Sequence, residues 1–376
     1  MEESAVATTN PVKYSANQSL TDLFAIDGTT IATANVTEYS AYQTFTERQL
    51  FSAYIFITMI VGYLGNSTVV YLVWSVKKLR TVTNVFVVNL AVADSTTCGG
   101  AILSAVVVLS YELIIPVWLC QCIAFGLITV IGCSVNTLAL IAVNRLVAVT
   151  DTARIRYRKI YTRWKIAAMI AMAWAIPIFV ALIPVFSDYA ELGYDPRFST
   201  CTWLSAPVDG LIYSFFVTLV FYPIQLTIVI ASYIRIFLFV RSSTKAVMLK
   251  GNPESGTPSS LQKQLSKRQL AVTKNLFLVV CVFLVCLFPY FFVLALDSLA
   301  FEALPFTAVL LLTNSCLNPI IYGTKHPDFR VEFSRLFSNF FGKCRSKRAK
   351  PLEERSRSVP SSSDKVATTD TKDTQV

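Results

Sequence analysis

The chain is divided into long apolar segments separated by short polar ones. Seven segments are long enough to cross a hydrocarbon layer about 30 Å thick, which takes roughly 20 residues in a helix. Each is predicted to be a helix, because every backbone polar group inside lipid must find a hydrogen-bond partner within the chain. The pattern therefore predicts an all-α integral membrane protein, a bundle of seven transmembrane helices. The segments are residues 51–76, 84–110, 117–149, 165–187, 210–240, 271–296 and 303–323.

Polar sequence flanks this bundle. Residues 1–50 are predicted to be an extracellular N-terminal segment, and residues 51–323 to form the bundle. Residues 324–342 are predicted to form a short amphipathic eighth helix, and residues 343–376, rich in Ser and Thr, a disordered tail. The N-terminal segment has no basic stretch followed by an apolar one, so it is not expected to be a cleaved signal peptide.

Lysine and arginine are distributed unevenly between the two sides of the predicted bundle. One side carries 30 of the 33, and the other carries only Lys13, Arg48 and Arg197. Cytoplasmic loops are the ones that carry this excess. We therefore expect a plasma-membrane protein with its N-terminus outside and its C-terminus in the cytoplasm. Asn17 and Asn35 then lie in extracellular Asn-X-Ser/Thr sequons that can be glycosylated.

Composition agrees with a membrane protein and argues against an enzyme. The chain is 54% hydrophobic and 15% charged, against about 25% charged residues in soluble domains. Its net charge of +10 follows from the topology, so nucleic acid is not an expected partner. His326 is the one histidine, and the sequence lacks H-E-x-x-H, G-x-S-x-G, P-loop and G-x-G-x-x-G motifs.

Two charged residues stand out within the apolar segments. Asp94 is a carboxylate deep in the second segment, and Arg145 follows 28 uncharged residues that run from Val117 to Asn144. Ionisable side chains are costly in lipid, so those that occur there are candidates for function. The alternatives are a structural hydrogen-bonding role for Asp94 and an interfacial anchor for Arg145.

Several of the predicted spans contain short polar or proline-containing motifs. The second segment contains "NLAVAD", the third closes on "NRL", and the sixth contains "FLVCLFP". The seventh ends in "NSCLNPIIY" and is followed by the amphipathic "PDFRVEF". In this order the motifs resemble those of the rhodopsin-like (class A) family of G-protein-coupled receptors. The resemblance implies a receptor that transduces the binding of an extracellular ligand to heterotrimeric G proteins. The alternative, a seven-helix transporter or channel, would need several intramembrane ionisable groups or internal repeats, and neither is visible.

The resemblance also implies roles for two groups of side chains. In the family a polar cluster midway through the bundle holds Na⁺, a hard cation that prefers oxygen ligands. No other cofactor is expected. The matching residues are Asp94, Ser134, Asn314 and Asn318. The residues expected to switch the receptor and couple it to the G protein are Asn144, Arg145, Phe283, Leu287, Pro289, Asn318, Pro319 and Tyr322.

Several positions depart from the family pattern. Asn144 stands where an acidic residue usually precedes the arginine, and Gln269 stands where many members have a glutamate. Both anionic partners that would hold Arg145 in an inactive arrangement are therefore missing, which predicts raised basal activity. In the fifth segment Ala231 replaces the usual tyrosine, and Tyr233 comes two residues late.

The cysteines suggest two modifications. The resemblance pairs Cys120 with Cys201 in an extracellular disulfide, although Cys122 is a rival partner only two residues from Cys120. Cys344 follows the amphipathic segment beside basic residues, which makes it a candidate for palmitoylation.

The ligand is not named by the sequence. Amine receptors of the family carry an aspartate where Leu127 stands, and opsins carry a lysine where Leu312 stands, so an amine and retinal are disfavoured. The outer side has 13 acidic and three basic residues, a net charge of −10 that would attract a cationic peptide. A small apolar ligand is equally open, and the acidic surface can also be simply solvated.

The C-terminal tail suggests further partners besides membrane lipid. Phosphorylation of its Ser and Thr residues would create the negative charge that arrestins bind. Thr374 and Val376 match the end of a peptide that adds a strand to a PDZ domain, with an apolar last residue and a hydroxyl two before it. The alternative is an end that binds nothing.

Overall fold

The computed structural model describes residue 42 and residues 44–110, 112–151, 153–205, 209–249, 277–278, 281–282, 284–296 and 303–348, all within one compact unit. Only the backbone is described for residues 205, 209–211, 243–249 and 339–348. Several predicted sites lie outside the described residues: Asn17, Asn35, Gln269, Phe283, Thr374 and Val376. For Cys344 the structure gives the backbone alone.

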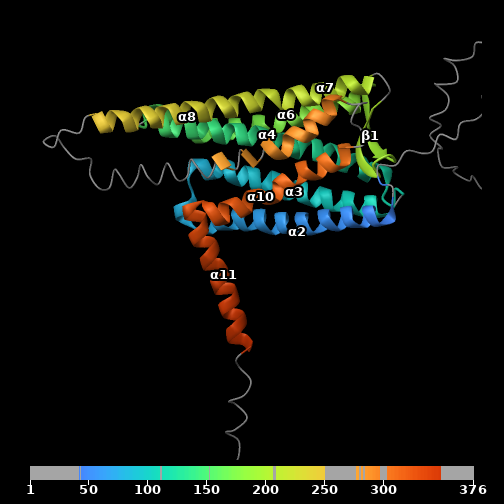
Figure 1. Cartoon of the computed structure of the whole chain (residues 1–376), viewed down its shortest axis with the longest axis horizontal. Helices are drawn as coiled ribbons and strands as arrows, with labels where there is room; N and C mark the ends of the chain where they lie inside the picture. Colours follow the sequence, from blue (N-terminus) through green and yellow to red (C-terminus); the bar gives the residue numbers. More distant parts are fainter. Residues whose placement is uncertain are drawn as a thin grey trace, which may run out of the picture. The chain divides into compact units, whose positions relative to one another are not determined.

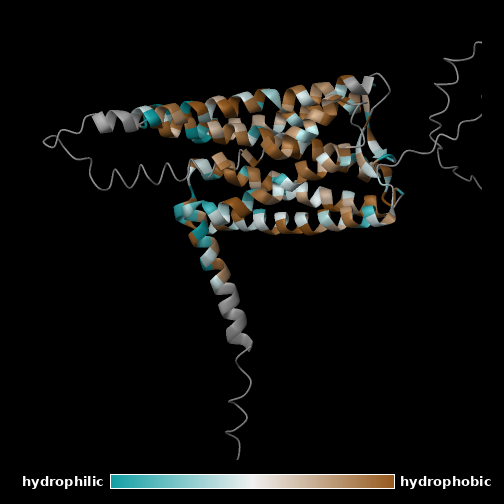
Figure 2. Cartoon of the chain, in the orientation of Figure 1, coloured by the Kyte–Doolittle hydropathy of each residue, from teal (hydrophilic) through white to brown (hydrophobic). Residues whose placement is uncertain are grey.

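The described residues contain six apolar helices long enough to cross a membrane, and a shorter apolar helix over Leu284–Leu296. Their long axes run side by side (Figure 1), and hydrophobic residues predominate along them (Figure 2). The predicted helical membrane bundle is therefore confirmed. The first four and the last of the predicted spans correspond to α2 (Phe45–Ser75), α3 (Val82–Ser110), α4 (Val117–Thr150), α6 (Arg163–Phe186) and α10 (Leu304–Lys325).

The fifth predicted span differs from a continuous helix. It is divided into α7 (Asp209–Phe221) and α8 (Pro223–Leu249), which meet at Tyr222. Proline has no backbone N–H and its ring clashes with the preceding turn, so a helix that reaches Pro223 is interrupted there. The sixth predicted span is described only in part, as Leu284–Leu296.

The first helix begins earlier than its apolar stretch because its start is capped. The hydroxyl of Thr44 accepts a hydrogen bond from the backbone N–H of Glu47, and the Glu47 carboxylate accepts one from the backbone N–H of Thr44, both at 3.2 Å. This reciprocal pair satisfies two backbone donors that would otherwise lack partners at the helix N-terminus. It extends α2 into polar sequence and places Arg48 in its first turn.

The third transmembrane helix, α4, lies at the centre of the bundle. It packs against α3, α6 and α8, and 72% of its most apolar stretch is buried, against 22% for α6. The approach of its neighbours is close at Gly132, where a β-carbon would lie 2.6 Å from Pro177 in α6 and 2.8 Å from Phe221 in α7. Only a residue without a side chain fits this crossing.

A β-hairpin that the sequence did not predict connects α6 to α7. Strand β1 (Ala190–Asp195) pairs antiparallel with β2 (Thr200–Ser205), and Tyr194 lies opposite Cys201. Within the turn, the buried carboxylate of Asp195 accepts hydrogen bonds from Arg197 Nε at 2.9 Å and Arg197 Nη2 at 2.7 Å. Ser199 adopts a left-handed conformation, with φ of 49°. The predicted all-α fold class is therefore incomplete, because the described residues also contain this two-stranded hairpin.

Three further elements lie at the end of the bundle opposite the hairpin. They are the 3₁₀ helix η1 (Lys77–Leu79), α5 (Ile155–Ile160) and α11 (Pro327–Arg348). The amphipathic helix α11 runs beyond the predicted end at residue 342 and leaves the bundle at a steep angle (Figure 1). An ion pair of 3.2 Å between Lys78 and Asp328 joins its first turn to η1.

Candidate functional site

A buried carboxylate joins three helices in the middle of the bundle. Asp94 of α3 is fully buried, and its Oδ1 accepts hydrogen bonds from Ser134 of α4 at 3.0 Å and from Ser315 of α10 at 3.1 Å. Its Oδ2 accepts a hydrogen bond of 2.7 Å from the amide of Asn318. A buried charge is tolerated only when such partners compensate for the lost water.

This cluster contains one residue that the sequence reasoning missed. Ser315 bonds Asp94 through its side chain, and its backbone carbonyl accepts a hydrogen bond of 2.8 Å from Asn66 of α2. Asn66 also donates to the carbonyl of Gly62 at 2.9 Å. The signal that was available is the run "NSCLN", in which a serine directly follows Asn314 on an otherwise apolar helix.

The remaining predicted member, Asn314, makes no hydrogen bond to Asp94 in the described structure. Its side chain is buried, and its Oδ1 and that of Asn318 have no donor among the described residues. Oxygen acceptors without donors beside a carboxylate are the ligand chemistry that a hard cation takes. The residues present therefore fit Na⁺. No group of three or more His, Cys, Asp or Glu side chains in the described ranges is arranged to hold a metal ion.

A second polar network is centred on Asn144, near the C-terminal end of α4. Its amide oxygen accepts a hydrogen bond of 2.6 Å from Thr83, and its amide nitrogen donates to the hydroxyl of Tyr157 at 3.4 Å. Tyr161 also bonds Asn144, but burial outweighs this bond and raises the pKa of Tyr161 to about 12. The neutral amide thus uses both its acceptor and its donor.

Arg145, the next residue, has no ion pair among the residues that the structure describes. Tyr233 of α8 and Tyr322 of α10 lie close enough to act on its charge. The hydroxyls of these tyrosines and Nε of Arg145 are buried without hydrogen-bond partners. Polar groups from α4, α8 and α10 are therefore close to one another. Tyr233 lies near Arg145 although it comes two residues after Ala231, the position where the family usually has its tyrosine.

The predicted switch residues lie on the helices around this region. Leu287 is buried in the helix Leu284–Leu296, and Pro289 lies two residues further along. Pro319 of α10 packs so closely on α2 that a β-carbon on Gly65 would lie 2.7 Å from it. Tyr322 is buried and stacks on Phe329 of α11, with 5.7 Å between ring centroids.

At the opposite end, a disulfide joins the hairpin to the start of α4. Cys120 is bonded to Cys201 of β2, with 5.2 Å between their Cα atoms. Cys122 is a free, exposed thiol. The predicted disulfide between Cys120 and Cys201 is therefore confirmed, and the alternative with Cys122 is excluded.

Comparison with known proteins identifies the fold and the family. A family model described as "7 transmembrane receptor (rhodopsin family)" matches residues 65–322. The chain belongs to this family. Its family and its apolar helices make it a multi-pass membrane protein.

Individual relatives of this receptor are distant. The mouse alpha-1D adrenergic receptor is 30% identical over 321 residues, which cover 74% of this chain and 55% of that protein. The human melatonin receptor type 1B is 30% identical over 303 residues, which cover 76% of this chain and 77% of that one. The crystal structure of squid rhodopsin superposes with a TM-score of 0.69 at 18% identity, covering 85% of this chain and 96% of that one. The chain thus spans about half the length of the adrenergic receptors that it matches.

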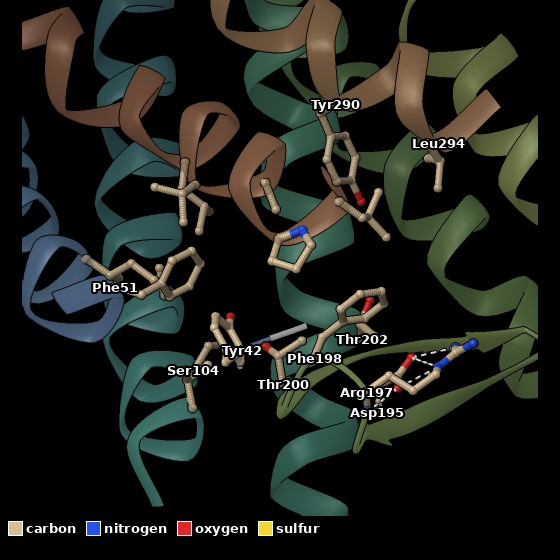
Figure 3. A pocket seen from close by; sticks show the side chains of 18 of the residues that line it. Tyr42, Phe51, Ser104, Asp195, Arg197, Phe198, Thr200, Thr202, Tyr290 and Leu294 are labelled. Atoms are coloured by element: carbon tan, nitrogen blue, oxygen red, sulfur yellow. Dashed lines mark hydrogen bonds and ion pairs between the residues drawn. The ribbon is translucent and has the colours of Figure 1, made fainter. Parts of the chain in front are cut away.

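Beneath its hairpin the receptor has two adjoining hollows, of about 130 and 150 Å³. Ser104 and Tyr290 line both, and Thr200 and Thr202 of β2 form part of the roof (Figure 3). No charged side chain of a described residue lines the hollow of 150 Å³. The hollow of 130 Å³ is lined by one acid, Asp195, whose carboxylate is held by Arg197.

The two positions that mark amine receptors and opsins in the family both face these hollows. Leu127 lines the hollow of 150 Å³, and Leu312 lines both. Each presents an aliphatic side chain where those receptors carry a charge. Among the described residues, these two positions therefore supply neither a carboxylate for an ammonium ion nor a lysine for a Schiff base.

The hairpin above the hollows is bound to α2 and α3 through a buried arginine, Arg48. From the sequence, this residue was only one of three basic residues on the outer side. Arg48 of α2 donates hydrogen bonds to the carbonyl of Val108 in α3 at 3.0 Å and to the hydroxyl of Ser199 at 2.9 Å. Its guanidinium also lies 5.1 Å from the ring centroid of Tyr42. A polar residue just before an apolar span gave no signal of this role.

Proposed function

We propose that this chain is a G-protein-coupled receptor of the plasma membrane, with its N-terminus outside and its C-terminus in the cytoplasm. It converts the binding of an extracellular ligand into activation of a heterotrimeric G protein. The observation that carries the proposal is Arg145, a cation near the end of α4 that has no ion pair in the described structure and whose Nε is buried without a hydrogen-bond partner there. The transporter alternative has no support from the family.

The ligand proposed for the hollows is a small, uncharged, largely apolar molecule. Their described linings are mainly aliphatic and aromatic with a few hydroxyl groups, and the buried hydroxyl of Ser104 has no hydrogen-bond partner among the described residues. A binding site of this kind uses apolar contact for affinity and a few polar groups for orientation. A cationic peptide is less well matched, because Asp195, the acid among the described lining residues, is already bound to Arg197.

The proposed switch runs along α4. Na⁺ held by Asp94 and its oxygen neighbours would stabilise the arrangement in which α3, α4 and α10 meet. Pro289 and Pro319 interrupt the hydrogen-bond ladders of their helices, and such positions absorb the bending that carries a small change at a pocket to the far end of a helix. The G protein would then bind at Arg145.

The test measures guanine-nucleotide exchange in cells that express the chain with each class of G protein. We expect ligand-independent exchange from the native chain and its loss in Arg145→Ala at equal surface expression. Arg156→Ala, which removes an exposed cation from α5, is the matched control and is expected to signal normally. Full exchange in Arg145→Ala, or no exchange by the native chain with any class, would reject the proposal.

Further proposed partners follow from the tail, where phosphorylation would recruit arrestin and the last residues would bind a PDZ domain. A peptide ending in Asp373-Thr374-Gln375-Val376 is expected to bind members of a PDZ panel. The same peptide with Val376→Ala, or with an amidated end, is expected to lose binding. Equal binding by all three peptides would show that the motif is not used.

A further inference from the structure

A groove opens away from the centre of the bundle, between α6 and α8. Its floor is α4, which packs against both of these helices. The groove has a volume of about 610 Å³. Its walls are aliphatic and thioether side chains, and the principal ones are Ala168, Met169, Met172 and Ile176 of α6 and Ile224 and Ile228 of α8.

The floor of the groove contains two amides, but their nitrogens are already used. Gln225 of α8 donates a hydrogen bond of 2.9 Å to the side-chain oxygen of Asn136 in α4. Asn136 donates one of 3.3 Å to the carbonyl of Ala173 in α6. Both amide side chains are buried, so the surface that the groove offers to an occupant is mainly apolar. This pair of bonds also holds α6 and α8 to α4, which keeps the groove in shape.

One end of the groove is cationic. Lys165 lines it, and its ammonium group donates a hydrogen bond of 3.0 Å to the backbone carbonyl of Lys159 at the end of α5. Lys159, Arg163 and Lys165 are exposed, and none of them forms an ion pair with a described residue. An occupant that carries a negative charge at this end would lie beside cations whose charge is not balanced by any acidic residue that the structure describes.

The length of the groove matches one leaflet. The lining residues of α6 run from Lys165 to Ile176, and at 1.5 Å per residue these 11 steps span about 16 Å. The hydrocarbon core of a bilayer is about 30 Å thick, so the groove reaches about half-way across it. An acyl chain of a lipid whose head lies at Lys165 would fill it.

We propose that the groove binds an anionic phospholipid, with its phosphate at Lys165 and Lys159 and one acyl chain between α6 and α8. The assignment of this end to the cytoplasmic leaflet, where anionic lipids are concentrated, rests on the orientation in the proposed function. The groove is separate from the hollows beneath the hairpin and shares no lining residue with them. Because α4 forms the floor and also carries Arg145, the lipid contacts the helix through which the proposed switch runs.

The test uses the full chain in nanodiscs of phosphatidylcholine with a small fraction of phosphatidylserine that carries a photoactivatable group in one acyl chain. Labelled peptides are mapped by mass spectrometry. We expect adducts on residues 165–176 of α6 and 224–228 of α8, at least threefold more than from a phosphatidylcholine probe with the same acyl chain. Unlabelled phosphatidylserine is expected to compete and unlabelled phosphatidylcholine not to compete.

Two variants address the two ends of the lipid, and each has a matched control. Ala168→Phe fills the groove, whereas Ala167→Phe adds the same side chain at an exposed position outside its lining. Lys165→Gln removes the cation in the groove, whereas Arg156→Gln removes an exposed cation of α5 that does not line it. We expect Ala168→Phe and Lys165→Gln to lose at least two thirds of the labelling, and both controls to retain it.

Several outcomes would overturn the proposal. They are equal labelling by the two probes, undiminished labelling in Ala168→Phe, and an equal loss in both controls while the melting temperature is unchanged. Labelling requires no G protein and no ligand. A chain that is labelled as expected but does not promote nucleotide exchange would therefore reject the proposed function and leave the lipid site standing. A chain that promotes exchange but is not labelled would reject the lipid site and leave the proposed function standing.

Discussion

The hydroxyl of Thr83 donates a 2.6 Å hydrogen bond to the side-chain oxygen of Asn144, one residue before Arg145. This bond joins α3 to α4 at the end of the bundle where Arg145 lies. A carboxylate at position 144 would accept the same bond and would also add a negative charge next to the arginine. Asn144 therefore joins α3 to α4 without placing a negative charge beside Arg145.

The first prediction concerns basal activity. We expect Asn144→Asp to lower ligand-independent nucleotide exchange, because the new carboxylate pairs with Arg145 and keeps it from the G protein. Adding Gln269→Glu, at a position outside the described residues, is expected to lower it further. Asn144→Leu removes the hydrogen bonds without adding charge and serves as the control. If Asn144→Leu lowers exchange as much as Asn144→Asp, charge is not the cause.

The second prediction concerns sodium at Asp94. If Na⁺ binds the folded receptor, its melting temperature is expected to be higher in NaCl than in choline chloride. Sodium at ten times its dissociation constant adds about 1.4 kcal/mol to the free energy of unfolding. Asp94→Asn is expected to abolish the difference, and Asp188→Asn, at an exposed carboxylate, to preserve it. Equal melting of the native chain in both salts would contradict the site.

The third prediction concerns the crossing of α4 with its neighbours. Gly132→Ala places a β-carbon 2.6 Å from Pro177, which forces the helices apart and is expected to cost about 1–3 kcal/mol. Gly126→Ala is the control on the same helix, because its β-carbon has open space. The control is expected to be neutral, or more stable by up to about 1 kcal/mol through helix propensity. Thermal unfolding that ranks the two variants in the opposite order would refute this packing.

The fourth prediction concerns Arg48. The carbonyl of Val108 is among the last four of α3, which have no partner within the helix, and Arg48 supplies one. Arg48→Ala removes this bond and the one to Ser199, and hydrogen bonds from a charged donor are worth about 1.5–3 kcal/mol each. We expect a clear fall in melting temperature for Arg48→Ala and a smaller one for Arg48→Lys. An unchanged melting temperature in Arg48→Ala would show that the two contacts do not stabilise the receptor.

The transmembrane helices were predictable because lipid imposes one requirement on every residue of a span. Hydropathy alone placed α3 and α4 within two residues of their observed bounds. It did not place the start of α2, which depends on the bonds between Thr44 and Glu47, or the interruption at Pro223, which depends on one ring within an apolar run.

The candidate site was predicted where the family motifs name the residues, and incompletely elsewhere. The contacts of Asp94 with Ser134 and Asn318 follow the resemblance, whereas the contact with Ser315 depends on how α10 faces α3. Burial of Arg48 likewise depends on Val108 and Ser199, which lie 60 and 151 residues away in the sequence. A pattern read along the chain contains no information on such distant partners.

The bond between Cys120 and Cys201 also sets an order on the biosynthesis of the receptor. The two residues are 81 positions apart, so a ribosome that adds roughly 5–20 residues per second makes the second thiol about 4–16 s after the first. During that interval the native partner of Cys120 has not yet been synthesised, and Cys122 is its neighbour on the nascent chain. The native bond therefore forms only after the strand carrying Cys201 has been made, and any earlier disulfide of Cys120 must be exchanged for it. A chain truncated before residue 201 cannot form this bond.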